Sequence, residues 1–120
     1  IAPALWHAVA GAVYVRDTLG IADGEIIRAI RFHTIGCAQM SLLEKIVYLG
    51  DMISAERDYK DVDKFRKICY DGIDKAMSVA LIYNIESVCK KCGYIPRYSF
   101  EAYNYYLDFN KDKDGDPVRL

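Results

Sequence analysis

The sequence predicts an all-α domain, and three observations lead to this prediction. Apolar residues recur along most of the chain with the three- and four-residue spacing of an amphipathic helix. No segment shows the convincing alternation of apolar and polar residues that marks a half-buried strand. Several periodic stretches begin at a residue that commonly caps a helix, such as Asp23 or Ser41. Because the chain has 120 residues, 52% of them hydrophobic, we expect one domain with one core.

Two helices are expected in the first third of the chain. The first runs from about Ala4 to Leu19 and ends at Gly20, because a residue without a Cβ suits the left-handed conformation at a helix C-terminus. The second runs from about Asp23 to His33, with the Asp23 carboxylate accepting hydrogen bonds from the first free N–H groups. Both predicted helices carry a histidine, His7 in the first and His33 at the end of the second.

The third helix has the clearest start signal and ends near an aspartate. Ser41 and Glu44 have the spacing of a capping box, in which each side chain accepts a hydrogen bond from the backbone of the other. Asp51 then lies close to the C-terminal end, where the helix dipole disfavours a carboxylate. A cation, a hydrogen-bond donor or a bound metal would compensate this charge. A solvent-exposed aspartate that tolerates the penalty is the alternative.

The second half of the chain predicts three more helices and a polar tail. A short helix spans about Asp61 to Tyr70, and a long one runs from Asp71 or Asp74 to Cys92. Ser99 is expected to cap the last helix. Residues 110–120 are polar and charged, and we expect them to be a disordered tail.

Composition excludes several classes of function. The net charge is −1 and the basic residues are interspersed with acidic ones, so no nucleic-acid-binding surface is expected. No apolar run approaches the roughly 18 residues of a membrane span, and no secretory signal is recognisable, which favours a cytoplasmic protein. Cys89 and Cys92 have the C-x-x-C spacing of redox and zinc motifs. They fall at the end of a helix with no second pair, so we interpret them as ordinary thiols.

The two histidines and Asp51 point to metal and phosphate chemistry. Imidazole and carboxylate groups are the usual ligands of iron, manganese and zinc, and His7, His33 and Asp51 all lie on predicted helices or at their ends. A packed or surface role for each histidine is the alternative reading.

Several linked motifs resemble the YqeK family of HD-domain hydrolases, the symmetrical diadenosine tetraphosphate hydrolases. The resemblance rests on the segments 3–8, 27–34 and 40–46 and on the stretch from Asp51 to Arg57, which occur in the order of the family. It continues more loosely to residue 105 and so covers most of the chain.

The resemblance implies an iron-dependent enzyme that splits a dinucleoside tetraphosphate into two nucleoside diphosphates, with manganese or another divalent metal able to replace iron. Asp51 would be a metal ligand. His7 and His33 would face the phosphate chain, either as ligands of a second metal or as hydrogen-bond donors to the substrate. Thr34 and Arg57 would hold phosphate. The nucleotide would lie near a segment whose matching residues are Tyr98, Ser99, Phe100 and Tyr103.

The chain also departs from the family pattern. The metal-binding His-Asp doublet of the family, and a histidine before it, would lie upstream of Ile1. We therefore expect residues 1–109 to be the C-terminal portion of one HD-type domain that lacks its N-terminal helices. We expect such a fragment to be inactive by itself and to expose an apolar face that favours aggregation or a homodimer. Cys37 and Ser54 replace an arginine and a glutamate of the family.

Two alternatives to the favoured function stay open, the first motivated by these departures and the second by the shared architecture. One is a degenerate, non-catalytic HD-like domain that binds a nucleotide or a protein partner. The other is a phosphatase of nucleoside mono- or diphosphates, whose products would include inorganic phosphate.

Overall fold

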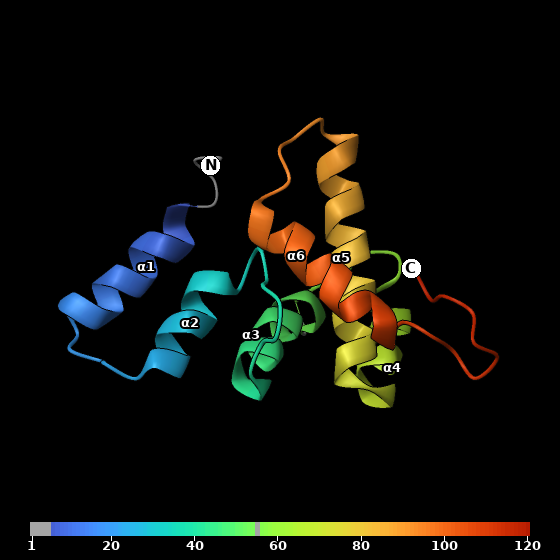
Figure 1. Cartoon of the computed structure of the whole chain (residues 1–120), viewed down its shortest axis with the longest axis horizontal. Helices are drawn as coiled ribbons and strands as arrows, with labels where there is room; N and C mark the ends of the chain where they lie inside the picture. The colour runs from blue at the N-terminus through green and yellow to red at the C-terminus, as the bar shows by residue number, and fades with distance from the viewer. Residues whose placement is uncertain (1–5, 55) are drawn as a thin grey trace.

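The computed structural model describes residues 6–54 and 56–120, and within these ranges every regular element is helical. The elements, shown in Figure 1, are α1 (Trp6–Asp17), α2 (Gly24–Phe32), α3 (Leu42–Ile53), α4 (Val62–Asp71), α5 (Ile73–Lys90), α6 (Arg97–Tyr106) and the short 3₁₀ helix η2 (Leu107–Phe109). The all-α prediction is thus confirmed. The expected start of the first helix, Ala4, lies outside the described residues. None of the described helices is long and apolar enough to cross a membrane.

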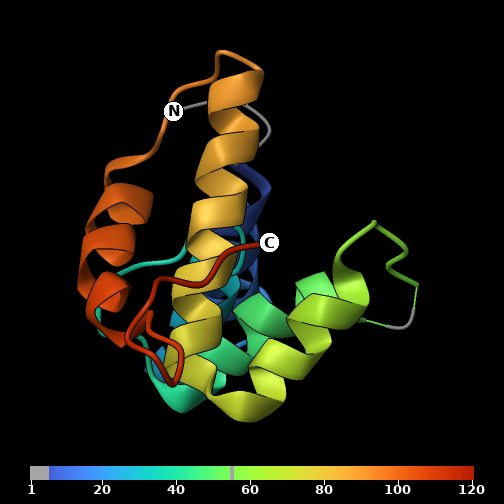
Figure 2. The ribbon, with the colours of Figure 1, turned by 90° about the vertical axis from the view of Figure 1, so that its right-hand side faces the viewer.

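The core is built around α5, the longest helix. Every residue from Ala76 to Leu81 is buried, and α5 contacts α3, α4, α6 and η2. Figure 2 shows α5 standing between α6 on one side and the α3–α4 pair on the other. The large side chains that complete the core come from the surrounding helices and include Phe32, Tyr48, Phe65 and Tyr106. A single core of this kind fixes the ends of α2 and α3 relative to the middle of α5.

The α1–α2 hairpin lies at one edge of the fold. Among the described elements, α1 contacts only α2, and α2 in turn contacts α3. Large apolar side chains remain exposed on α1 and α3; they are Trp6, Val9, Val13 and Tyr14 on the former and Leu42, Leu43, Ile46 and Val47 on the latter. Each of these two helices thus leaves several large apolar side chains accessible.

The predicted helix caps are only partly as expected. The Asp23 carboxylate accepts hydrogen bonds from the N–H groups of Glu25 and Ile26 at 2.9 and 3.2 Å, which confirms it as an N-cap. Ser41 Oγ accepts from the Glu44 N–H at 3.2 Å, but the Glu44 carboxylate points into the interior, so the reciprocal half of the capping box is missing.

The N-cap expected at Ser99 is wrong. Helix α6 already begins at Arg97, so Ser99 lies within its first turn. Its hydroxyl donates instead to the main-chain oxygen of Ile35 at 2.6 Å and ties α6 to the segment after α2. A serine in a first helical turn can serve a tertiary contact in place of a cap, and its sequence position does not distinguish the two roles.

The C-terminal segment 110–120 differs from the expected disorder. Buried Asn110 donates to the Val118 carbonyl at 2.9 Å and accepts from the Val118 N–H at 2.7 Å. The Asp112 carboxylate accepts from the N–H groups of Asp114 and Asp116 and closes a turn between them. Figure 2 shows the segment folding back along α5, where Val118 and Leu120 pack against the core. Local carboxylate-to-backbone bonds order a stretch whose composition resembles a solvated tail.

Candidate functional site

A pocket of about 300 Å³ opens where α3 and α5 meet the segments that follow α2 and α3. It is lined by His33, Thr34, Tyr48, Asp51, Met52, Arg57, Tyr59, Tyr83 and Asn84. Four of these were candidates from the sequence: His33 and Thr34 after α2, Asp51 on α3, and Arg57 in the α3–α4 loop. The fold therefore brings residues from three separate segments to one pocket.

The C-terminal end of α3 is surrounded by guanidinium groups. Arg57 donates to the main-chain oxygen of Asp51 at 2.8 Å and to its carboxylate Oδ1 at 3.1 Å. Arg66 from α4 donates to the main-chain oxygens of Ile53 and Ser54 at 3.2 and 3.0 Å. These donors offset the negative end of the helix dipole, where Asp51 would otherwise be unfavourable. The carboxylate of Asp51 keeps a second oxygen, which is chemically suited to serve as a ligand.

His33 lies beside His7 at the edge of the pocket. Nδ1 of His33 is 2.5 Å from the main-chain oxygen of Ile30, and because a carbonyl oxygen can only accept, this nitrogen carries the proton. Nε2 of neutral His33 is then left with its lone pair, the arrangement of a metal ligand or a hydrogen-bond acceptor. The ring centroids of His7 and His33 are 5.2 Å apart at an interplanar angle of 75°. His7 does not line the pocket itself and adjoins it through His33.

A buried tyrosine and two further polar groups form the inner wall. Asn84 donates to the Tyr48 hydroxyl at 2.7 Å. Burial raises the pKa of Tyr48 to about 12, with the Asn84 hydrogen bond acting weakly in the opposite direction. Tyr48 therefore stays a neutral hydroxyl at physiological pH. Oγ1 of Thr34 is buried and has no hydrogen-bond partner among the residues that the structure describes, so a ligand oxygen at this point would satisfy it.

A second, smaller cavity of about 80 Å³ adjoins the first. The two share Thr34, Tyr48 and Asn84, and the second is otherwise lined mostly by apolar residues and by Ser99. Thr34 thus lies at the junction of the two cavities, where a bound group could contact both.

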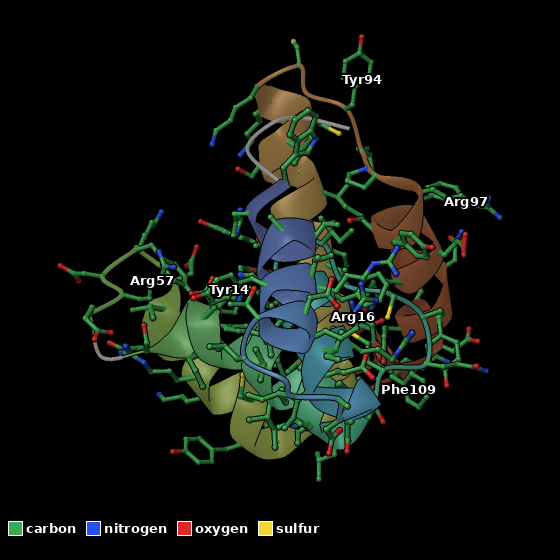
Figure 3. The ribbon with its side chains drawn as sticks, turned by 90° about the vertical axis from the view of Figure 1, so that its left-hand side faces the viewer. Tyr14, Arg16, Arg57, Tyr94, Arg97 and Phe109 are labelled. Carbon is green, nitrogen blue, oxygen red and sulfur yellow. The ribbon has the colours of Figure 1, made fainter. Side chains whose placement is uncertain are left out.

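The other residues of the predicted nucleotide segment lie elsewhere. Tyr98 packs edge-on against Phe32 at 5.1 Å between ring centroids, Phe100 is exposed, and neither these residues nor Tyr103 line the main pocket. Figure 3 shows Arg57, at the main pocket, and Arg97, at the start of α6, on opposite sides of the molecule.

Sequence reasoning missed five residues of the pocket, of which Met52 directly follows Asp51 on α3. Tyr48 lies one turn before Asp51 on the same helix, so its spacing could have identified it as a neighbour. Tyr59, Tyr83 and Asn84 gave no such signal, because the fold alone brings the α3–α4 loop and α5 to this place.

The described residues do not supply a complete metal site. No group of three or more His, Cys, Asp or Glu side chains in residues 6–54 and 56–120 could hold a metal ion. Asp51 and His33 have suitable donor chemistry and share a pocket, but a stable site requires more ligands than these two. Within the described chain they fit only part of a coordination shell.

Comparison with known proteins gives consistent relatives, although no protein-family model matches the chain. It is 40% identical over 103 residues to a protein of Halalkalibacterium halodurans, covering 86% of this chain and 55% of that one. It is 35% identical over 105 residues to one of Bacillus subtilis, covering 88% and 56%. Both are named symmetrical bis(5′-nucleosyl)-tetraphosphatase.

A solved structure shares the fold. It is that of a predicted HD superfamily hydrolase involved in NAD metabolism from Clostridium acetobutylicum, with a TM-score of 0.81 and 37% identity. The match covers 86% of this chain and 55% of that one. The chain thus spans about half the length of the curated relatives it matches.

Proposed function

The chain belongs to the YqeK family of HD-domain hydrolases, and we propose that the whole protein hydrolyses diadenosine tetraphosphate with one water to two molecules of ADP. The HD-type helical fold predicted from the sequence is confirmed by the solved relative. The observation that carries the proposal is the meeting of His33, Thr34, Asp51 and Arg57 in one pocket. The guanidinium, the imidazole and the hydroxyl can donate hydrogen bonds to phosphate oxygens. The carboxylate can act as a metal ligand.

Each of these residues has a proposed role that follows from its chemistry. Arg57 presents a fork of donors that suits phosphate oxygens, and its bonds to Asp51 hold it at the pocket. Thr34 offers the buried Oγ1 to a phosphate oxygen. His33 presents Nε2 as an acceptor when neutral and as a donor when protonated, and His7 supports its orientation through the ring contact.

The HD hydrolase fold implies a divalent metal, and we propose iron, which manganese can replace, because imidazole and carboxylate ligands suit both. Asp51 would contribute one carboxylate oxygen, and His33 and His7 are the nearest imidazoles. A metal bound there would neutralise charge on the phosphate oxygens and make a water more acidic. The ligands that the described residues lack would have to come from elsewhere in the whole protein.

A nucleoside contact is proposed for the segment Tyr98, Ser99, Phe100 and Tyr103. Its support is that Ser99 edges the smaller cavity, which shares Thr34 with the main pocket. A ligand with a phosphate at Thr34 could extend one nucleoside in this direction.

A non-catalytic role is the second candidate. It is favoured by the incomplete ligand set of the described residues and by the engagement of Asp51 with Arg57. In that case the pocket would bind a nucleotide without hydrolysing it, or the domain would bind a protein partner.

One experiment tests these functions together. The complete reading frame that encodes this chain is expressed, loaded anaerobically with iron and incubated with diadenosine tetraphosphate, and the products are separated. ADP as the only product supports symmetrical hydrolysis, whereas inorganic phosphate would indicate a phosphatase. No turnover despite bound metal would favour the binding domain. Asp51→Asn should lower the bound metal per protein, while Asp71→Asn, at an exposed position of α4 outside the pocket, should not.

The proposed partners are the nucleotide and a second copy of the protein. We propose a cytoplasmic protein without nucleic-acid or membrane partners, in keeping with its near-zero net charge. The apolar side chains of α1 and α3 would pair with those of a second copy. Light scattering of the 120-residue chain should then give twice the mass of one copy. The mass of a single chain would contradict the homodimer.

A further inference from the structure

Besides the buried Tyr48, two tyrosine rings line the main pocket, and neither belongs to the segment that the sequence assigned to the nucleotide. Tyr59 comes from the α3–α4 loop and Tyr83 from the middle of α5. Their ring centroids are 5.8 Å apart and their planes are tilted by 31°. This is much closer to a parallel arrangement than the edge-on packing of Tyr105 on Tyr106, which line none of the cavities described above.

The Tyr59 ring is held in place by its own hydroxyl. The hydroxyl donates to the main-chain oxygen of Met52 at 2.9 Å, which links the α3–α4 loop to α3. Tyr83 lies on the rigid central helix and is 36% exposed. A tyrosine that served only the core would be buried, as Tyr48 and Tyr106 are. Tyr83 instead keeps part of its surface accessible beside a partner ring that is fixed.

The pocket combines this aromatic wall with the charged groups already described. Arg57, Thr34 and His33 offer donors for phosphate, whereas the two tyrosine rings offer uncharged faces. A nucleoside phosphate has the same division into an anionic end and a flat aromatic end. About 300 Å³ is at the lower limit for a small-molecule site, so the pocket suits one nucleotide end of a dinucleotide better than the whole molecule.

We propose that Tyr59 and Tyr83 form a stacking platform for one of the two nucleobases of the substrate. This inference rests on the proposed function, since a dinucleoside tetraphosphate has two bases and needs a place for each. Ser99 of that segment lines the smaller cavity, whereas the tyrosine pair lines the main pocket. Stacking of this kind accepts any base, so the platform would give affinity for nucleotides without selecting adenine.

The test compares ADP with inorganic pyrophosphate, which has the same diphosphate but no nucleoside. Binding of both to the full protein is measured by calorimetry, for wild type and for three variants. Tyr83→Leu removes the ring, and Tyr83→Phe keeps it. Tyr70→Leu is the matched control, because Tyr70 is almost fully exposed on α4 and lines neither pocket. Tyr59 is left intact, since its hydroxyl also holds the loop that carries Arg57.

We expect Tyr83→Leu to weaken ADP binding about tenfold while pyrophosphate binding changes less than about twofold. Tyr83→Phe and Tyr70→Leu should bind both ligands like wild type. Equal weakening of ADP and pyrophosphate would show a structural role for Tyr83 and overturn the platform, as would unchanged ADP binding.

The result separates the platform from the proposed hydrolysis. If diadenosine tetraphosphate is cleaved but Tyr83→Leu binds ADP as tightly as wild type, only the platform is contradicted. If ADP binds in a Tyr83-dependent way but no cleavage occurs, the hydrolysis fails and the platform stands. Wild-type protein that binds no ADP would overturn the platform whatever its activity.

Discussion

The guanidinium of Arg57 donates hydrogen bonds to two atoms of Asp51, the carboxylate oxygen Oδ1 and the main-chain oxygen. The bonded atoms belong to the last turns of α3 and to the loop that follows it. The pair therefore closes the loop against the helix and sets a positive and a negative group side by side in the pocket. Neither group is buried, with side-chain exposures of 49% and 56%.

Arg57→Ala should impair catalysis much more than folding. Loss of a charged hydrogen bond to phosphate should reduce kcat/KM of the full enzyme by about 10- to 100-fold. Because the ion pair with Asp51 is exposed, the free energy of unfolding should fall by less than about 1 kcal/mol. Arg16→Ala, which breaks an exposed pair with Asp17 outside the pocket, is the control. Steady-state kinetics and urea unfolding measure the two effects, and a large loss of stability would assign Arg57 a structural role.

Replacing the exposed partner of the Arg28–Glu44 pair should cost more stability than replacing the buried one. The Glu44 side chain is 4% exposed and that of Arg28 is 51% exposed, with 3.3 Å between Nε and Oε1. Arg28→Met leaves a buried carboxylate without its cation and should destabilise by about 3 kcal/mol. Glu44→Gln leaves a guanidinium that can turn to water, at about 1 kcal/mol. Equal losses in urea unfolding would contradict this asymmetry.

Stability should fall at alkaline pH in part through Tyr48. Burial raises the pKa of Tyr48 to about 12 in the folded protein, against an ordinary value of 10. Folding thus favours the neutral form of Tyr48. Its contribution to the free energy of unfolding is complete below pH 10 and is lost as the pH rises toward 12. The loss amounts to about 2 to 3 kcal/mol. Urea unfolding between pH 9 and 12 should show a shallower decline for Tyr48→Phe, and parallel curves would refute the assignment.

Asn110→Ala should destabilise the protein, although it lies at the start of a segment with the composition of a disordered tail. The Asn110 side chain is buried and its two hydrogen bonds to Val118 are partly buried, so their loss should cost about 2 kcal/mol. Asn104→Ala on the exposed surface of α6 should change stability by less than about 0.5 kcal/mol. Thermal melting of both variants compares their stabilities. An unaffected melting temperature for Asn110→Ala would support the original expectation that residues 110–120 are disordered.

The helical fold could be predicted from the sequence because helix signals are local. Apolar spacing and the cap at Asp23 depend on residues only a few positions apart, and these features are as expected. The need for a compensating group at Asp51 was also a local argument, and the donor is Arg57, six residues later. Ser99 and Glu44 were misjudged for the same reason: each has a side chain committed to a distant segment rather than to its own helix end.

The candidate site could be predicted only in part. His33, Thr34, Asp51 and Arg57 were found through linked motifs, but the tyrosines and Asn84 complete the pocket by tertiary packing. Asn84 meets Tyr48 across 36 positions of sequence, a pairing that no periodic pattern encodes. The segment 110–120 was expected to be disordered because composition does not record the hydrogen bonds that an individual asparagine or aspartate can make.

The helices around the pocket differ in how many neighbouring helices restrain them, because α1 contacts only α2 among the described elements. Asp51 and Tyr83 lie on helices that several neighbours restrain, whereas His7 lies on a helix that contacts α2 alone among the described elements. Local opening is easiest where the fewest contacts must break, so the α1 edge should yield long before α3 or α5 does. The two histidines lie next to each other, but they belong to segments that the rest of the fold restrains to different extents. Within residues 6–54 and 56–120, the separation of His7 and His33 is therefore restrained by fewer contacts than that of Asp51 and Tyr83.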